Sequence, residues 1–355
     1  MRFSFPTVIA YPTPRNWRPP LAPIPLSVKP QDHFWFNRPI ASDSVNYPLW
    51  TYRYGSNEQG GAPIHAGIDI DAPMGTPIRA AGPGVVVWAD WGLFTFTPGV
   101  ESDPYGLAVE IRHDFGYKGQ PLYTLYGHME RINDDLYVGQ RVQTGDILGW
   151  VGITGRTTGP HVHFEVRVGK NDYYYTRNPE LWIAPYSGWG VLAGQLLDER
   201  GRYIIDTAIA IHDATGRYVT TVYTYGYRVA RPDDEWRENF AISDLPAGNY
   251  LLRTILSPGS EVTTTETIEG MVTIVPDQTT FVILKQGVGL LTNILPASSQ
   301  TPPYPTNTFT PTATPSNTNT PTATRTPSAT YTLRPSRTPS PTLTPRPSRT
   351  PTTGN

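Results

Sequence analysis

Short apolar runs that alternate with polar residues, with Gly and Pro interrupting them every few positions, constrain this fold most. GTPIRAAGPGVVVWAD (75–90), YGLAVEIRHD (105–114) and HVHFEVRVG (161–169) are examples. A period of two with such interruptions is typical of β-strands and turns. The sequence contains no convincing long segment with the 3.6-residue period of a helix. It therefore predicts an all-β protein.

The two ends of the chain differ from this pattern. Residues 1–40 hold nine prolines, and residues 301–355 hold 19 Thr, 13 Pro and 5 Ser. Proline removes backbone donors, and such segments bury too little apolar surface to offset the entropy cost of ordering. We expect a Pro-rich irregular lead-in at 1–40. We expect a disordered Thr/Pro/Ser-rich tail at 297–355, serving as an extended spacer or dispensable.

Composition excludes several classes of protein. The chain has no Cys, which excludes a disulfide scaffold, cysteine ligation of zinc and a thiol nucleophile. A formal net charge of −2 offers no case for nucleic-acid binding. No stretch approaches the ~18 apolar residues that span a membrane. Pro6 interrupts the short apolar run at the start, so the export signal is not convincing.

Four of the seven histidines fall in three short motifs: His65 in IHAGIDID, His128 in YGHME, and His161 with His163 in TGPHVHFEV. Residues two apart on a strand point to the same side, so His161 and His163 would share a face. Two imidazoles on one face need a group that organises them, and a metal does so. His65 and Asp69 would add one nitrogen and one oxygen ligand. Together with one His of the HxH pair they make three protein ligands, which is the pattern of a catalytic zinc site with an open fourth position.

Residues 41–187 resemble the M23 peptidases, the lysostaphin/LytM-type zinc endopeptidases of peptidoglycan. Four segments carry the resemblance: HAGIDIDAPMGTPIRAAGPGVV (65–86), LYTLYGHM (122–129), VGQRVQTGDILGWVGITGRTTGPHVHFEV (138–166) and NPELWI (178–183). The resemblance implies a LytM-type hybrid β-sheet/barrel domain. It also implies a metalloendopeptidase that hydrolyses peptide bonds of bacterial peptidoglycan, in stem or cross-bridge peptides.

The resemblance also implies roles for five residues. His65, Asp69 and His163 match the family's zinc ligands, with one zinc per peptidase domain. His128 and His161 match the two histidines that flank the metal. Zinc would lower the pKa of a bound water toward ~7, and the two histidines would assist that metal-activated water in catalysis. Which histidine acts as the general base is left open.

Other positions receive more modest expectations. Glu165 alternates with His163, so it could orient an imidazole or be an ordinary polar strand residue. We expect structural roles for His33, His113 and His212. Two insertions depart from the family pattern, at 91–104 and 117–121, and both are expected to form loops that could line the substrate groove.

Residues 191–290 resemble the carboxypeptidase-regulatory-like, transthyretin-type β-sandwich modules. GQLLDERGRYIIDTAIAIHDATGR (194–217) and FAISDLPAGNYLLR (240–253) carry this resemblance, although Tyr203 stands where proline is common. The resemblance implies a small β-sandwich that binds carbohydrate or wall, positions the peptidase or acts as a spacer. Tyr223, Tyr225 and Tyr227 alternate, and would either stack on sugars or pack a core.

Two alternatives to the enzyme remain open. One is a non-catalytic LytM-like wall-binding protein or hydrolase activator, a class expected to lose zinc ligands that this chain keeps. The other follows from VQTGDILGWVG (142–152), which also resembles biotinyl and phosphotransferase hybrid-barrel modules. No M-K-M lysine is present, and a phosphocarrier would leave His65 and Asp69 without a role. We expect a monomer that is extracellular or located in the cell envelope.

Overall fold

The computed structural model describes residues 29, 31–41, 48–49, 52–56, 64–226, 230–257 and 265–292. The predicted tail at 297–355 and most of the predicted lead-in lie outside these residues. Within them, the elements are strands apart from two short 3-10 helices, which confirms the all-β prediction. No helix in the described part of the chain is long and apolar enough to cross a membrane.

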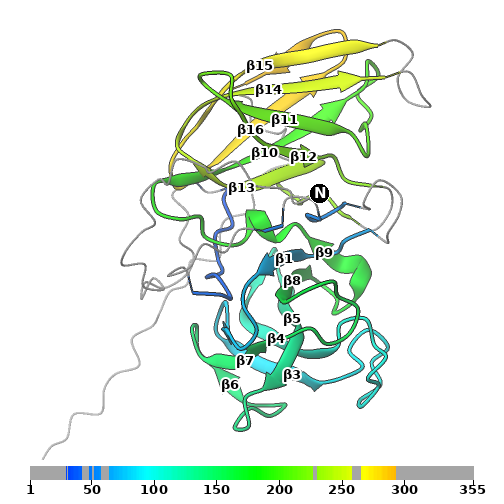
Figure 1. Cartoon of the computed structure of the whole chain (residues 1–355), viewed down its shortest axis with the longest axis vertical. Helices are drawn as coiled ribbons and strands as arrows, with labels where there is room; N and C mark the ends of the chain where they lie inside the picture. The colour runs from blue at the N-terminus through cyan, green and yellow to red at the C-terminus, as the bar shows by residue number, and fades with distance from the viewer. Residues whose placement is uncertain are drawn as a thin grey trace, which may run out of the picture. The chain divides into compact units, whose positions relative to one another are not determined.

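Nine strands form one sheet (Figure 1). Its main path runs β1-β8-β5-β4-β3-β6; β7 pairs with β2 and β5, and β9 pairs with β8. The strands are β1 (Ile68–Asp71), β2 (Pro77–Arg79), β3 (Gly84–Asp90), β4 (Leu107–Tyr117), β5 (Gln120–Ile132), β6 (Arg141–Val142), β7 (Ile147–Val151), β8 (His161–Val168) and β9 (Thr176–Arg177). Two 3-10 helices flank β9, η1 (Tyr173–Tyr175) and η2 (Pro179–Leu181).

Strand β8 is buried on both faces, which is unusual for a strand with charged residues. One face contributes apolar side chains to the hydrophobic core: Val162, Phe164, Val166 and Val168. The other face carries polar and charged side chains: His161, His163, Glu165 and Arg167. Buried charges are costly unless they are paired or coordinate a metal, so this second face is where a site is expected.

A tight turn joins β4 to β5. Tyr117 pairs with Gln120, which leaves Lys118 and Gly119 as the turn residues, with φ of 49° and 74°. Positive φ at both positions suits a two-residue hairpin turn. The expected loop at 117–121 is therefore wrong, because the strands continue into the turn. The other insertion, 91–104, does form a loop, between β3 and β4.

Two four-stranded sheets follow (Figure 1). Their orders are β13-β10-β16-β17 and β12-β11-β14-β15. The strands are β10 (Trp189–Leu197), β11 (Ala208–Asp213), β12 (Tyr218–Tyr223), β13 (Phe240–Pro246), β14 (Gly248–Leu256), β15 (Glu266–Ile274), β16 (Thr279–Lys285) and β17 (Gly289–Leu291). One hydrophobic cluster contains residues from both sheets, including Leu192 of β10 and Leu252 of β14. This is the arrangement of a β-sandwich; its relationship to carboxypeptidase-regulatory-like modules and the domain boundaries stay predictions.

Tyr225 packs in the core. Its side chain is buried, its hydroxyl donates to Glu238 Oε1 at 2.8 Å, and Asn178 Nδ2 donates to it at 2.9 Å. Of the three alternating tyrosines, Tyr225 is therefore unavailable to stack on a sugar. Tyr227 lies outside the described residues.

The larger hydrophobic core extends from the nine-stranded sheet into the sandwich region. It includes Phe164 of β8 together with Trp236 and Phe281. Phe36, within the predicted lead-in, is also part of this core and forms a parallel bridge with Ile183. Buried ion pairs accompany these apolar contacts: Arg53–Glu180, Arg38–Asp244 and His33–Asp233.

The shared core generates the first prediction. Trp236 is 1% exposed and stacks on Phe281, so Trp236→Ala should lower the free energy of unfolding by about 3–5 kcal/mol. Denaturant titration measures this. The control is Met271→Ala, because Met271 is 52% exposed and should change stability by no more than about 0.5 kcal/mol. Equal effects of the two variants would contradict the shared core.

Candidate metal centre

The pairing of β1 with β8 brings two of the predicted ligands together. Asp69 of β1 lies opposite His163 of β8 in the antiparallel register, so the two side chains share a face. His65 lies just before β1, and Gly67 lets this segment approach β8 closely. A Cβ at Gly67 would come within 2.4 Å of the Phe164 carbonyl oxygen, so no larger residue fits there.

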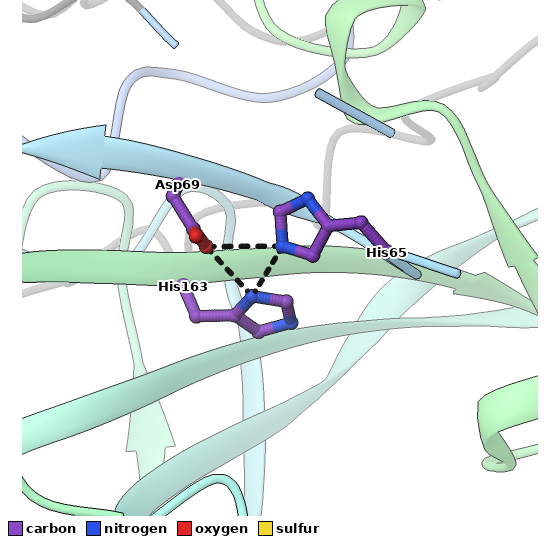
Figure 2. Close-up of side chains that lie close together, drawn as sticks. All are labelled: His65, Asp69 and His163. Carbon is purple, nitrogen blue, oxygen red and sulfur yellow. Dashed lines mark hydrogen bonds and ion pairs between the residues drawn. The ribbon is translucent and has the colours of Figure 1, made fainter. Parts of the chain in front are cut away.

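Three ligand atoms converge at this point (Figure 2). His65 Nε2 is 3.1 Å from Asp69 Oδ1 and 3.0 Å from His163 Nδ1. His163 Nδ1 is 2.9 Å from Asp69 Oδ1. All three residues are buried. The structure thus brings together the three residues that the sequence nominates as metal ligands.

The chemistry of this group fits a cation. His163 Nε2 lies 3.0 Å from Glu165 Oε1, and a carboxylate accepts, so the ring proton sits on Nε2 and Nδ1 faces the other two ligand atoms. Burial disfavours charge on His163, but its hydrogen bonds to Asp69 and Glu165 outweigh burial and raise its pKa to about 9, so at neutral pH Nδ1 also carries a proton that a cation would displace. The pocket therefore favours a positive charge. Two imidazole nitrogens and a carboxylate oxygen, without sulfur, are ligands that zinc accepts.

His128 and His161 lie beside this group with their ring protons fixed. Nδ1 of His128 donates to the Thr154 carbonyl at 2.8 Å, and Nδ1 of His161 donates to the Gly159 carbonyl at 2.8 Å. The neutral rings therefore carry an unprotonated Nε2. Their centroids are 4.7 Å apart, and His161 Nε2 is 3.5 Å from Asp69 Oδ2.

Burial keeps both of these rings neutral. It lowers the pKa of His161, and it lowers the pKa of His128 to about 3, with the neighbouring histidines adding to the effect for His128. A neutral imidazole is the form that accepts a proton. Both rings are therefore in the form that can accept a proton at neutral pH, although a pKa of about 3 makes His128 a weak base.

The backbone at His128 is held in an uncommon conformation. Its φ is 61°, in the left-handed region that non-glycine residues rarely adopt. His128 N donates to the Tyr105 carbonyl at 2.8 Å, and Gly152 N donates to the His128 carbonyl at 3.0 Å. Such strain persists where surrounding contacts over-determine it, which is common at functional sites.

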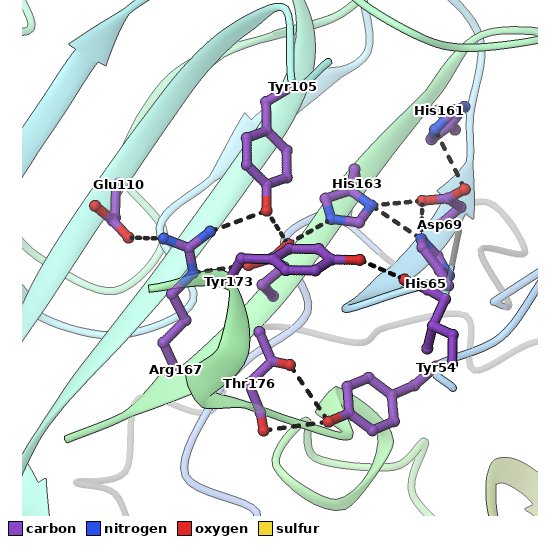
Figure 3. Close-up of polar contacts among 12 residues, drawn as sticks. Tyr54, His65, Asp69, Tyr105, Glu110, His161, His163, Arg167, Tyr173 and Thr176 are labelled. Atoms are coloured by element: carbon purple, nitrogen blue, oxygen red, sulfur yellow. Dashed lines mark hydrogen bonds and ion pairs between the residues drawn. The ribbon is translucent and has the colours of Figure 1, made fainter. Parts of the chain in front are cut away.

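A buried polar network supports His163 from behind (Figure 3). Tyr105 donates to Glu165 Oε1 at 2.6 Å, and Arg167 Nε donates to Glu165 Oε2 at 2.7 Å. Arg167 Nη1 also donates to Glu110 Oε1 at 3.3 Å. Sequence reasoning missed three members of this network. Continuing the alternation of HVHFEVR by one step would have found Arg167, whereas Tyr105 and Glu110 have no comparable local signal.

The remaining histidines lie outside the group of three ligand residues. His113 shares hydrogen bonds with Thr124 at 2.8 Å and with the Pro83 carbonyl at 3.1 Å, and burial lowers its pKa to about 3. His33 pairs with Asp233 at 2.8 Å. These contacts agree with the structural roles expected for both residues.

The sequence of residues 63–175 matches the family model described as Peptidase family M23. The DD-carboxypeptidase/endopeptidase Mpg of Neisseria meningitidis is 38% identical over 105 residues, which are 30% of this chain and 20% of that protein. The peptidoglycan DD-endopeptidase ShyC of Vibrio cholerae is 40% identical over 104 residues, which are 29% of this chain and 20% of that protein. The chain thus spans about a fifth of the length of these two relatives.

A staphylococcal relative and a solved structure are also similar to part of this chain. Lysostaphin of Staphylococcus staphylolyticus is 29% identical over 144 residues, 40% of this chain and 27% of that protein. A solved mutant catalytic domain of the prophage-encoded M23 protein EnpA from Enterococcus faecalis is 34% identical, with a TM-score of 0.28. The similarity covers 41% of this chain and 89% of that domain. On the sequence matches, residues 63–175 of this chain form a domain of peptidase family M23.

Proposed function

We propose that this protein is a zinc-dependent endopeptidase that hydrolyses peptide bonds of bacterial peptidoglycan. The convergence of His65 Nε2, Asp69 Oδ1 and His163 Nδ1 is the observation that carries the proposal. The substrate class is suggested by the names of the relatives, which include peptidoglycan DD-endopeptidases and a glycyl-glycine endopeptidase.

His65, Asp69 and His163 would hold one zinc ion. When bound, zinc supplies Lewis acidity, which acidifies a water molecule and polarises a carbonyl group. Glu165 keeps the proton of His163 on Nε2, so the ligand atom Nδ1 stays free of a proton when a metal is present. All three ligand residues are largely buried, which strengthens their electrostatic interactions with a cation.

His128 and His161 would manage the protons of the reaction. Hydrolysis forms a bond between a water oxygen and the peptide carbonyl carbon, and it breaks the bond from that carbon to nitrogen. One imidazole Nε2 accepts the proton that the water loses, and a proton returns from imidazole to the leaving amine. The carbonyls of Thr154 and Gly159 fix each Nδ1 proton and stabilise the charge on a ring that gains a second proton. The proposal assigns the pair to this work, not one particular ring.

The arrangement favours an enzyme over the non-catalytic wall-binding protein or hydrolase activator. Such a protein would not need three converging ligand atoms with two neutral histidines beside them. The substrate also sets the location we propose, because peptidoglycan lies outside the cytoplasmic membrane. We therefore propose a protein of the cell envelope or the extracellular space that acts as a monomer, with no nucleic-acid partner.

Zinc analysis tests the ligands. The purified full chain should hold about one zinc, as expected for a catalytic site. His163→Ala should lose it, because the substitution removes one of three protein ligands and leaves Glu165 without its imidazole partner. His212→Ala, in strand β11, is the control and should retain zinc. Elemental analysis after dialysis measures this; a stoichiometric metal in His163→Ala would refute the assignment.

Separate variants test the proton-handling pair. His128→Ala and His161→Ala should keep zinc and lose roughly 10²–10⁴-fold in turnover, the range that general acid–base groups supply. The assay is release of soluble fragments from purified peptidoglycan, with His212→Ala again as the control. Wild-type turnover in either variant would remove that residue from the proposed mechanism.

Mass spectrometry of the released muropeptides identifies the bond. Walls with glycine-rich cross-bridges and walls with directly linked stem peptides are digested in parallel. New amino termini should appear in at least one wall type, and they should be absent with His163→Ala. Fragments produced equally by wild type and His163→Ala would show that the activity does not come from this site.

A further inference from the structure

Tyr105 lies at the end of the loop that joins β3 to β4, and this loop has a fixed shape. Asp103 is 2% exposed, and its carboxylate accepts three backbone donors. Oδ2 accepts from Phe94 N at 2.9 Å and from Thr95 N at 3.3 Å, and Oδ1 accepts from Tyr105 N at 3.0 Å. A buried carboxylate bound in this way holds the loop together, and it fixes the position of the Tyr105 backbone.

The side chain of Tyr105 contacts Glu165, the hydrogen-bond partner of His163 (Figure 3). Its hydroxyl donates to Glu165 Oε1 at 2.6 Å, and His163 Nε2 donates to the same oxygen at 3.0 Å. Arg167 Nη2 in turn donates to the tyrosine oxygen at 3.0 Å. Glu165 is fully buried, and three donors hold its carboxylate: Tyr105 and His163 at Oε1, and Arg167 Nε at Oε2.

The backbone of Tyr105 reaches the other half of the site. Its carbonyl accepts from His128 N at 2.8 Å. His128 is the residue with φ of 61°, so its ring direction depends on what holds its main chain. Tyr105 therefore contacts Glu165, the partner of His163, through its hydroxyl. It contacts His128 through its carbonyl.

We propose that Tyr105 is a positioning residue, which orients His163 through Glu165 and holds His128 through its own carbonyl oxygen. The loop at 91–106 is then part of the proposed site, because it positions Tyr105. This inference rests on the proposed function, because it concerns the orientation of a metal ligand. It makes no claim about contact between Tyr105 and substrate.

The substitution Tyr105→Phe separates the two contacts, because it removes the hydroxyl and keeps the backbone carbonyl. Zinc affinity of the full chain is measured by competition with a chromogenic chelator. Loss of an outer-shell partner typically costs 10–100-fold in metal affinity, and we expect roughly 10-fold here because the tyrosine acts through Glu165. The visible absorption bands of the Co²⁺-substituted protein should also change, since they report ligand geometry.

Tyr126→Phe is the matched control. Tyr126 is buried as Tyr105 is, but its hydroxyl accepts from Ala81 N at 2.8 Å and shares a hydrogen bond with Thr124 at 2.9 Å instead of contacting Glu165. Both variants should lose some thermal stability, but only Tyr105→Phe should lose zinc affinity and alter the cobalt spectrum. Equal zinc affinities in the two variants would overturn the inference.

Glu165→Gln is a second test, and it does not depend on whether the tyrosine variant folds. The amide keeps the size of the side chain but cannot accept from His163, Tyr105 and Arg167 together. Zinc affinity should fall 10–100-fold. Unchanged affinity would overturn the inference, whereas a wild-type chain that holds no zinc would overturn the proposed function and this inference together.

Discussion

The antiparallel pairing of β1 with β8 is the constraint on which the site depends. It places Asp69 opposite His163, and a slip of one residue would turn one of these side chains to the other face. Gly67 makes the approach of His65 possible, because a Cβ there would collide with the β8 backbone. The geometry of the proposed metal ligands therefore comes from strand register and one close backbone contact.

Paired charges on the polar face of β8 hold this strand in place. Glu165 and Arg167 are essentially buried, and each has its hydrogen bonds satisfied by named partners. Attraction to Arg167 and the hydrogen bond from His163 outweigh burial, which would raise the pKa of Glu165, and hold that pKa at about 2. Ionised Glu165 accepts a hydrogen bond from His163 Nε2, which leaves Nδ1 facing Asp69. The core side chains on the opposite face hold the strand that carries all of these groups.

The choice of His163 as third ligand and the roles of His128 and His161 followed from the resemblance to the M23 family. Strand alternation is a local signal, and it predicted the all-β class. His161, His163 and Glu165 share a face for that reason alone. Tyr105 could not be found in this way, since its role depends on a loop closed by Asp103 and on contacts more than 50 residues away in the chain. The turn at Lys118 and Gly119 was missed because an insertion relative to a family pattern can extend strands as well as lengthen a loop. The burial of Tyr225 depended on Asn178 and Glu238, which no short-range pattern connects to it.

Anomalous diffraction at the zinc edge from crystals of the purified protein tests the central claim most directly. The account predicts one anomalous peak in the M23 domain, bonded to His65 Nε2, Asp69 Oδ1 and His163 Nδ1 at about 2.0–2.2 Å. His128 and His161 should lie beside this peak without binding it. A peak ligated by other residues, or no peak between these three in protein that still degrades peptidoglycan, would contradict the account.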